Sequence, residues 1–264
     1  YGYSADQTLN IAQTLYEKKV ITYPRTGSRY IGEDVFEQIE ALFQHLSDYA
    51  EESIASIAKN LIGAKLNKRS VDDKKVTDHH ALLVTDEKPG HMLKEQQNIY
   101  NMIAKRMVES FSEVCIKDIT TVTIDAQGVE LIAKGTVIKQ YGWRLSAEQI
   151  DAPDEDKNND DQDNENAQLP KLLAEELLQI LTLELAERFT KARPIHTEAS
   201  LLKAMETSGK EIEDDEMRQA MKDCGLGTPA TRAATIETHF QRDYIKRDKK
   251  KLIPTEKGLA VYNL

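Results

Sequence analysis

The stretch Val20–Tyr30, VITYPRTGSRY, interrupts a helical pattern and turns the chain at a cluster of reactive side chains. Its first three residues are β-branched and favour a short strand. Pro24 cannot continue a helix, and it pushes Tyr23 before it into an extended conformation. The pattern therefore predicts a tyrosine at the end of a short strand, followed by a polar loop.

The side chains after Tyr23 suit the chemistry of phosphate esters. A tyrosine is a poor nucleophile at neutral pH because its ordinary pKa is near 10. The guanidinium groups of Arg25 and Arg29 favour the phenolate and bind a phosphodiester through two parallel hydrogen bonds. Tyr23 with Arg25 is thus a candidate phosphoryl-transfer pair. Taken by itself, the stretch also fits an ordinary surface turn.

The remaining chain alternates between helical and strand patterns, which predicts an α+β protein that is mostly helical. Ser4 is a candidate N-cap for the first helix. After the last helix, two short strands flank a lysine-rich turn, and helices followed by such a hairpin are typical of a winged-helix domain. The expected helices cover residues 5–19, 33–46, 50–62, 94–111, 170–189, 197–207, 214–223 and 229–242, and the expected strands cover 20–22, 116–124, 129–134, 135–145, 244–247 and 251–254.

A second cluster, Thr77–Thr85 (TDHHALLVT), holds paired histidines. Adjacent residues of a strand point to opposite faces, and no third ligand stands nearby, so the pattern does not favour a zinc site. As a phosphate contact or proton donor, His79 is productive only if it lies beside Tyr23. Otherwise it is an ordinary core or surface histidine.

A third cluster, Gly225–Ala234 (GLGTPATRAA), is expected to open a helix with Thr228 as N-cap and Pro229 at the first helical position. Backbone amides at a helix start, the hydroxyls of Thr228 and Thr231, and the Arg232 guanidinium suit a phosphate backbone. The alternative is a helix cap with ordinary threonines. No Walker, GxGxxG, GxSxG or HExxH motif is present.

Composition limits the class of protein. The 264 residues are 40% hydrophobic and 30% charged, and they include 12 Gly and 7 Pro, which excludes a collagenous or disordered chain. No apolar run reaches the length of a membrane span, and two distant cysteines fit a reducing cytosol, so we expect a cytoplasmic protein. The chain begins with Tyr1, which suggests a piece of a longer protein.

The net charge of −10 argues against binding to nucleic acid unless the acidic residues are confined to one part of the chain. Segment 151–166 carries eight acidic residues and one Lys, a net of −7, which leaves −3 for the rest of the chain. It has no periodicity and is expected to be a solvated loop or linker. The acidity therefore belongs to this segment and does not exclude a DNA-binding surface elsewhere.

Together and in this order, the clusters resemble the type IA DNA topoisomerases and, within them, the bacterial topoisomerase III branch. The resemblance spans essentially the whole chain. Four segments carry it, namely Ile21–Arg29 (ITYPRTGSR), Asp78–Thr85 (DHHALLVT), Thr197–Glu206 (TEASLLKAME) and Gly225–Arg232 (GLGTPATR).

The resemblance implies an isomerase that works without ATP. Tyr23 would attack single-stranded DNA and form a 5′-phosphotyrosine, Arg25 would bind the scissile phosphate, and His79 would position or protonate it. Further DNA-binding residues implied by the resemblance, together with the clusters above, are Arg29, Thr197, Glu198, Ser200, Thr228, Thr231 and Arg232.

The resemblance also implies an architecture and partners. The fold would be part of a torus, with winged-helix-like (CAP-like) domains and an antiparallel β-rich arch. The expected domains are a gate domain with the tyrosine at 1–94, a hinge or arch with the acidic loop at 95–189, and a DNA-binding domain at 190–264. Mg²⁺ would be held by a Toprim domain preceding Tyr1, so no metal is expected in this chain. The chain alone would be an inactive fragment. The resemblance also implies a location in the bacterial cytoplasm, near the nucleoid.

Two departures and one alternative accompany the resemblance. The family usually has Asp where Gly27 stands, so an acid that could organise Arg25 or the nearby loop is missing here. At Leu83 and Val84 the family more often has Ile and Pro. The alternative function is a non-enzymatic winged-helix DNA-binding protein, in which residues 197–254 bind DNA and Tyr23 has no chemical role.

Overall fold

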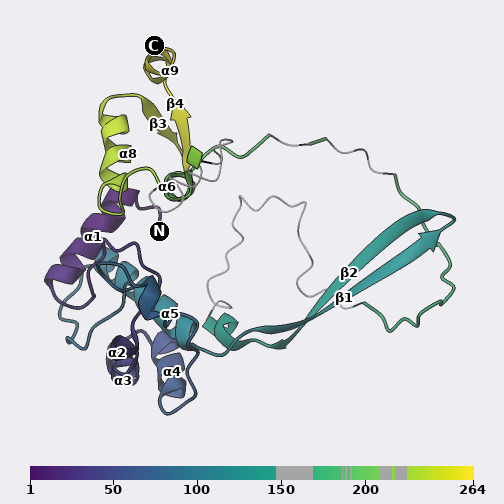
Figure 1. Ribbon diagram of the computed structural model, residues 1–264, viewed down its shortest axis with the longest axis horizontal. Coiled ribbons are helices and arrows are strands. Elements are labelled where there is room, and N and C mark those ends of the chain that lie inside the picture. The colour runs from purple at the N-terminus through teal and green to yellow at the C-terminus, as the bar shows by residue number, and fades with distance from the viewer. Residues whose placement is uncertain (147–168, 186, 188, 191, 209–215, 218–224) are drawn as a thin grey trace. The chain divides into compact units, whose positions relative to one another are not determined.

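A computed structural model describes residues 1–146, 169–185, 187, 189–190, 192–208, 216–217 and 225–264. The chain divides into two compact units. Unit 1 comprises Tyr1–Ser110 and Arg193–Leu264, and unit 2 comprises Phe111–Ala192. Each is described by itself (Figure 1).

The N-terminal half of unit 1 consists of helices, as the apolar periodicity predicts. Ser4 caps α1 through a capping box with Gln7, which confirms it as N-cap. Phe43, Leu46 and Tyr100 are among the fully buried side chains of the core. The helices are α1 (Ala5–Glu17), α2 (Glu33–Phe36), α3 (Ile39–Tyr49), α4 (Glu52–Leu61) and α5 (Lys94–Phe111), with a 3₁₀ turn at Asp73–Lys75.

The single helix expected over residues 33–46 is wrong, because the chain forms α2 and then α3. The Gln38 amide donates to the Val35 carbonyl at 3.0 Å, an i→i−3 bond that tightens the backbone between the two helices. Ile39 and Phe43 behind this turn are fully buried. The tightened turn thus changes the phase of the helix so that the apolar residues of α3 face the core.

The C-terminal part of unit 1 contains α6 (Glu198–Glu206), α8 (Arg232–Gln241), the antiparallel strands β3 (Ile245–Asp248) and β4 (Lys251–Pro254), and α9 (Glu256–Tyr262). The lysine-rich hairpin is confirmed. Arg247 on β3 lies over the Phe240 ring of α8, 3.6 Å from its centroid, and Leu252 on β4 is buried. Of the helix expected over residues 214–223, only residues 216–217 are described, and these two are helical.

The expected start of α8 at Thr228-Pro229 is wrong. Residues 228–231 form a turn that leads into α8, in which the Thr231 amide donates to the Thr228 carbonyl at 3.0 Å and the Thr228 amide donates to Thr231 Oγ1 at 2.9 Å. The Arg232 amide donates to the same carbonyl at 3.1 Å, and α8 begins at Arg232, with Thr231 in the N-cap position.

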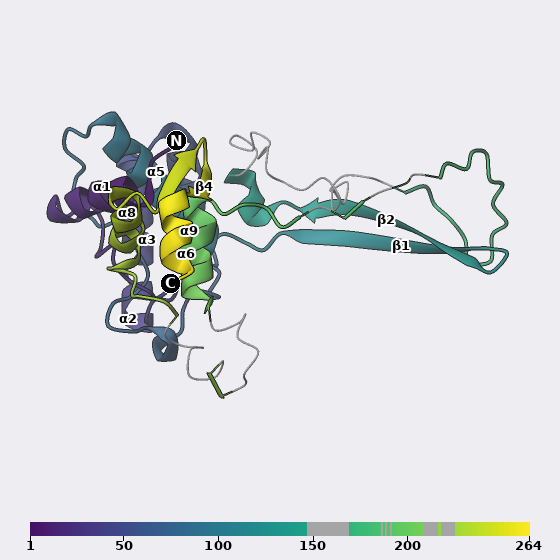
Figure 2. The same cartoon turned by 90° about the horizontal axis from the view of Figure 1, so that it is seen from above.

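Unit 2 is dominated by a two-stranded antiparallel hairpin of β1 (Ile116–Ala126) and β2 (Val129–Gln140) (Figures 1 and 2). Gln127 and Gly128 both have positive φ in the connecting turn, which suits a tight hairpin. The third strand expected from residue 135 is wrong. Gly135 continues β2 opposite Thr120, and the unbroken register removes the need for a turn there.

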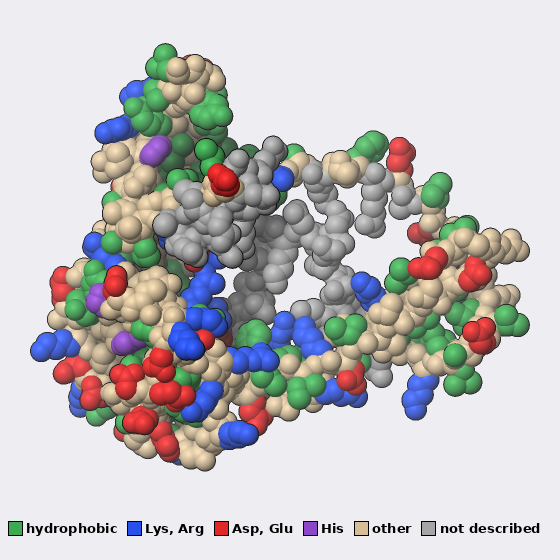
Figure 3. Space-filling model, in the orientation of Figure 1, with side chains coloured by type: hydrophobic (Ala, Val, Ile, Leu, Met, Phe, Trp, Pro, Cys, Tyr) green, Lys and Arg blue, Asp and Glu red, His purple; other side chains and the backbone are tan. Residues whose placement is uncertain are grey.

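Pairing places Val122, Ile124, Leu131 and Ala133 on one face of the hairpin. Apolar and uncharged side chains dominate this hairpin, whereas acidic and basic side chains mix over the helical part of unit 1 (Figure 3). After it, Gly142 has φ +52°, and a Cβ there would lie 2.4 Å from the Val114 carbonyl oxygen. A glycine is thus required where the chain closes on the base of β1.

The helix expected over residues 170–189 is wrong for its described residues, which form no helix and are exposed apart from Leu172. Leu177 is 98% exposed and Leu181 is 88% exposed. Helices gain most of their stability from packing an apolar face, and no described residue covers these leucines. The acidic segment 151–166 lies outside the described residues. None of the described helices combines the length and the apolar character that a membrane crossing needs.

His45 on α3 makes the stability of unit 1 dependent on pH. It is 8% exposed, and its Nε2 has no hydrogen-bond partner among the described residues. Burial lowers the pKa of His45 below its ordinary value of 6.5, and the carboxylates of Asp86, Asp48 and Glu87 offset only part of this effect. The folded state therefore resists the protonation that the unfolded chain accepts.

We expect the free energy of unfolding to fall as the pH is lowered from 7 to 5, because the unfolded state binds a proton at His45 that the folded state does not. His45→Leu should flatten this part of the pH profile. Urea titrations at both pH values measure the effect. Equal pH dependence of the two proteins would contradict it.

Candidate functional site

The tyrosine loop begins where α1 ends. Lys19 adopts a left-handed conformation, φ 63°, the Lys19 amide donates to the Tyr16 carbonyl at 2.8 Å, and the Val20 amide donates to the Leu15 carbonyl at 3.1 Å. These two bonds are a Schellman motif, which reverses the chain direction at a helix end. The reversal turns the Val20–Tyr23 segment back from the last turn of α1.

Short antiparallel pairing then joins the tyrosine segment to the histidine segment. Ile21 and Val84 form a bridge, the Thr22 amide donates to the Leu83 carbonyl at 2.9 Å, and the Leu83 amide donates to Thr22 Oγ1 at 2.9 Å. Ile21 and Val84 are almost fully buried, so the pairing is anchored in the core. The short strand expected at residues 20–22 is thus present as this bridge.

This pairing brings Tyr23 and His79 together, as the sequence required for a shared site. Their ring centroids are 4.5 Å apart, with an angle of 47° between the rings. A third ring, that of Tyr16 on α1, contacts Tyr23 edge-on at 5.4 Å and 73°. Tyr23 is half-buried and His79 is exposed, so the pair is open to solvent on the histidine side.

Hydroxyl groups also tie the two loops. Thr26 Oγ1 donates to the His79 carbonyl at 3.0 Å and accepts from the Ser28 amide at 3.1 Å. Ser28 Oγ lies 3.1 Å from the Tyr30 carbonyl and 3.2 Å from the Lys75 carbonyl. Thr26 therefore fixes the backbone of His79 relative to the tyrosine loop.

Arg25 has an unused hydrogen-bond donor. Its side chain is half-buried, and the buried Nε has no partner among the described residues. A buried donor without a partner is costly and calls for an explanation, such as a ligand that would accept its bond. Arg25 is therefore the candidate anion-binding residue of the tyrosine loop.

Arg29 does not lie free for a phosphate. Its Nη2 is 2.7 Å from Glu206 Oε1 on α6, and Lys203 Nζ lies 3.0 Å from Glu206 Oε2. Lys203 first, and Arg29 with it, hold the pKa of Glu206 below its ordinary value. The tyrosine loop is thereby joined to the Thr197–Glu206 segment by an exposed ion pair.

Gly27 lies at another contact of the tyrosine loop with the C-terminal part of unit 1. A Cβ at Gly27 would come within 3.3 Å of Pro229 Cγ in the GLGTPATR segment. A larger residue would need Pro229 to move by a few tenths of an ångström. The chain thus has Gly in place of the family's usual Asp at a position where the tyrosine loop lies close to Pro229.

The Thr197–Glu206 segment uses its polar side chains for structure. Thr197 and Ser200 form the capping box of α6, which confirms this helix start. Glu198 accepts from the Ala5 amide at 2.7 Å and from Arg247 Nε at 2.7 Å. Glu198 therefore links α6 to the start of α1 and to β3.

The GLGTPATR segment likewise satisfies its own groups. Arg232 Nε donates to the Leu226 carbonyl at 3.0 Å, and its Nη2 donates to the Gly227 carbonyl at 3.0 Å. Thr228 Oγ1 and Thr231 Oγ1 are 3.1 Å apart. Arg232 thus braces the turn before α8, and residues 226–229 of this turn are exposed.

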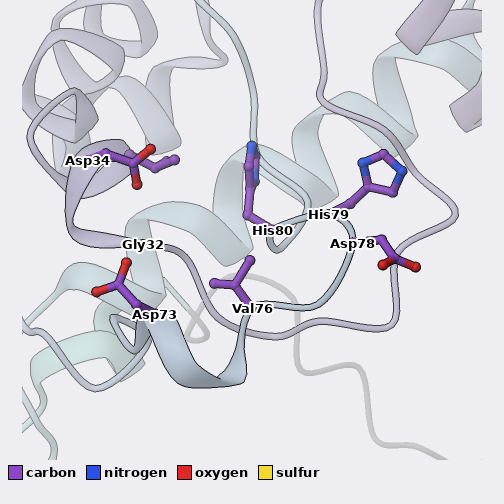
Figure 4. Close-up of a pocket in the computed structure, with 8 residues that line it drawn as sticks. Gly32, Asp34, Asp73, Val76, Asp78, His79 and His80 are labelled. Atoms are coloured by element: carbon purple, nitrogen blue, oxygen red, sulfur yellow. The ribbon is translucent and has the colours of Figure 1, made fainter.

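A pocket of about 340 Å³ lies next to His79 (Figure 4). Figure 4 shows the side chains of His79 and His80 leaving their loop in different directions. His80 Nδ1 is 2.7 Å from the Ala81 carbonyl, which makes Nδ1 the protonated nitrogen in the neutral tautomer. The residues that line the pocket are Gly32, Asp34, Val35, Asp73, Val76, Asp78, His79 and His80.

The described residues do not offer a metal centre. No group of three or more His, Cys, Asp or Glu side chains in this part of the chain is arranged to hold an ion. The Mg²⁺ that the resemblance implies has no fitting ligand set among the described residues.

The structure thus brings Tyr23, His79 and the tyrosine loop together, and it connects Arg29 to α6. It also shows two neighbours that the sequence did not indicate, Tyr16 beside Tyr23 and Glu206 beside Arg29. Spacing along the chain carries no signal for either contact, because one crosses a helix end and the other joins residues 177 positions apart.

Comparison with known proteins identifies the family of the chain. The chain matches the family model described as DNA topoisomerase over residues 1–264. It is 33% identical to DNA topoisomerase 3 of Bacillus licheniformis, covering 100% of the chain and 36% of that protein, and 31% identical to DNA topoisomerase 3 of Vibrio cholerae, covering 98% and 39%.

Full-length topoisomerase I from Thermotoga maritima has a similar fold, with a TM-score of 0.59 and 22% identity over 99% of this chain and 39% of that one. The chain therefore spans somewhat more than a third of the length of these proteins. These matches confirm the resemblance to the bacterial type IA enzymes and their topoisomerase III branch. The chain belongs to the DNA topoisomerase family.

Proposed function

We propose that this chain carries the DNA-cleaving tyrosine of a type IA topoisomerase of the topoisomerase III branch. Its substrate is single-stranded DNA. The observation that carries the proposal is the contact of Tyr23 with His79, in a loop where Arg25 keeps a buried donor unused.

Tyr23 Oη attacks the phosphorus of one phosphodiester in this proposal. The bond from phosphorus to Oη forms as the bond from phosphorus to the 3′ oxygen breaks. The phenol loses its proton and the leaving 3′ oxygen gains one, which leaves a 5′-phosphotyrosine and a free 3′-hydroxyl. The reverse reaction reseals the strand, and no ATP is needed because the ester conserves the bond energy.

Arg25 and His79 assist by binding the phosphate. Arg25 neutralises charge that develops on the phosphate oxygens in the transition state. His79 positions or protonates a phosphate oxygen, which its exposed position beside the Tyr23 ring allows. Arg29 would join them only after its ion pair with Glu206 opens.

The segments Thr197–Glu206 and Gly225–Arg232 were expected to bind DNA through their side chains, and the proposal gives these side chains a different role. We propose that the exposed turn before α8 and the start of α6 contact the DNA backbone through their surfaces. Thr197, Glu198, Ser200, Thr228, Thr231 and Arg232 act there chiefly by holding these segments in place, since most of their polar groups already have partners.

The larger architecture follows from the same proposal. Residues 1–94 form the gate, 95–189 the β-rich hinge or arch, and 190–264 a winged-helix-like DNA-binding domain within a torus. Mg²⁺ belongs to a Toprim domain on the same polypeptide, without which this chain is inactive. The protein works on DNA in the bacterial cytoplasm.

Tyr23→Phe should abolish covalent capture of DNA, because it removes only the attacking oxygen and keeps the ring. Binding of a single-stranded oligonucleotide should not change. The chain is supplied with a topoisomerase Toprim domain and Mg²⁺, and an oligonucleotide labelled at its 3′ end reports the adduct on a denaturing gel. If wild type never forms an adduct yet binds DNA, the non-enzymatic DNA-binding alternative is correct.

Arg25→Ala should slow adduct formation at saturating DNA by about 10²-fold, the usual effect of removing one transition-state donor. Arg25→Lys should recover part of the rate, since it restores the charge without the forked geometry. Single-turnover rates measure both. Arg69→Ala is the matched control, as Arg69 is an exposed arginine outside the tyrosine loop. A rate for Arg25→Ala equal to that control would refute the role of Arg25.

The chain alone should bind single-stranded DNA weakly and leave negatively supercoiled plasmid unrelaxed. Adding Toprim domain with Mg²⁺ should restore relaxation, and adding Toprim domain carrying substitutions of its acidic residues should not. Agarose gels of plasmid topoisomers give the readout. Relaxation by the chain alone would show that the site needs no metal domain.

A further inference from the structure

Tyr16 lies at the last turn of α1, and its ring is the second ring in contact with Tyr23. The two centroids are 5.4 Å apart at an angle of 73°, an edge-to-face geometry that aromatic pairs favour. Tyr23 is thus held between interactions from two separate segments, α1 through Tyr16 and the histidine segment through His79.

Backbone hydrogen bonds at the end of α1 fix the position of Tyr16. Its carbonyl accepts the Lys19 amide in the Schellman motif that ends α1, so the turn that leads to Tyr23 is built on Tyr16 itself. Leu15 next to it is fully buried and anchors this turn in the core. The ring of Tyr16, in contrast, remains 39% exposed.

A partly exposed aromatic ring is held in one rotamer only when it packs against another side chain. The Tyr16 hydroxyl has no hydrogen bond among the described residues, so the contact with Tyr23 involves the ring alone. A ring that packs edge-on against Tyr23 limits the rotation of that side chain about its Cα–Cβ and Cβ–Cγ bonds. The direction of the phenolic oxygen depends on those two torsions.

We propose that Tyr16 is a positioning residue for the nucleophile, which restricts the Tyr23 ring to the orientation needed for in-line attack. This inference rests on the proposed function of Tyr23. Tyr16 does not touch the phosphate in this scheme. It acts only through Tyr23, so its ring is required and its hydroxyl is not.

Another role for an exposed tyrosine beside a DNA site is a platform on which a base stacks. Base stacking on an aromatic ring contributes to affinity for the strand. The two roles therefore differ in which quantity changes. Positioning changes the rate of adduct formation at saturating DNA, and a stacking platform changes the dissociation constant.

The test uses the full chain with Toprim domain and Mg²⁺, and a single-stranded oligonucleotide as the probe. Tyr16→Leu should lower the single-turnover rate of adduct formation about 10-fold, since small misplacements of reacting groups reduce rates by up to about 10²-fold. The dissociation constant should change less than twofold. Tyr16→Phe should restore the wild-type rate, because it retains the ring.

Tyr49→Leu is the matched control, because Tyr49 is 41% exposed, lies on α3 and makes its ring contact with His45. It should leave the rate unchanged. Thermal unfolding of each variant establishes that it is folded, and Tyr16→Gln repeats the test if the leucine variant is unstable.

Three results would overturn the inference while wild type still forms the adduct. They are a wild-type rate for Tyr16→Leu, a rate for Tyr16→Phe as low as that of Tyr16→Leu, and a loss of affinity without a loss of rate, which would assign base stacking. Absence of any adduct in wild type would instead remove the proposed function of Tyr23.

Discussion

The candidate site depends on the antiparallel pairing of residues 20–22 with residues 83–85. Ile21 and Val84 lie in the core, and hydrogen bonds of Val20 and Thr22 to the opposite segment hold the register. A slip by one residue would turn these buried side chains to the other face. Because the register is set by the core, the loops that leave the pairing bring Tyr23 and His79 into contact.

Around this pairing the site is assembled from short polar links that carry little stability individually. Thr26 holds the His79 backbone, Glu206 pairs with Arg29, and Glu198 connects α6 with α1 and β3. The pair of Arg29 and Glu206 is exposed on both sides, and exposed ion pairs contribute at most about 1 kcal/mol. Such a link can open for a DNA phosphate at small cost, whereas the buried pairing cannot.

Sequence patterns correctly predicted the elements that are stabilised by residues close together in the chain. The cap at Ser4, the helix over residues 94–111 and the basic hairpin all follow from side chains within a few residues of each other. One of the wrong predictions involves a missing packing partner. The apolar segment 170–189 has the pattern of a helix, but most of its described leucines remain exposed, and propensity alone does not maintain a helix in water.

The sequence by itself determined the chemistry of the tyrosine loop, its order relative to the other clusters and the family to which these belong. These are properties of residue type and spacing, which need no fold. Only the tertiary structure decided that Tyr16 contacts Tyr23, that Glu206 holds Arg29, and that Arg232 and Glu198 are occupied by structural bonds. The core and the turns between segments fix the positions of the groups in each of these contacts. A hydrogen-bond donor then bonds to the acceptor that the folded chain brings within reach.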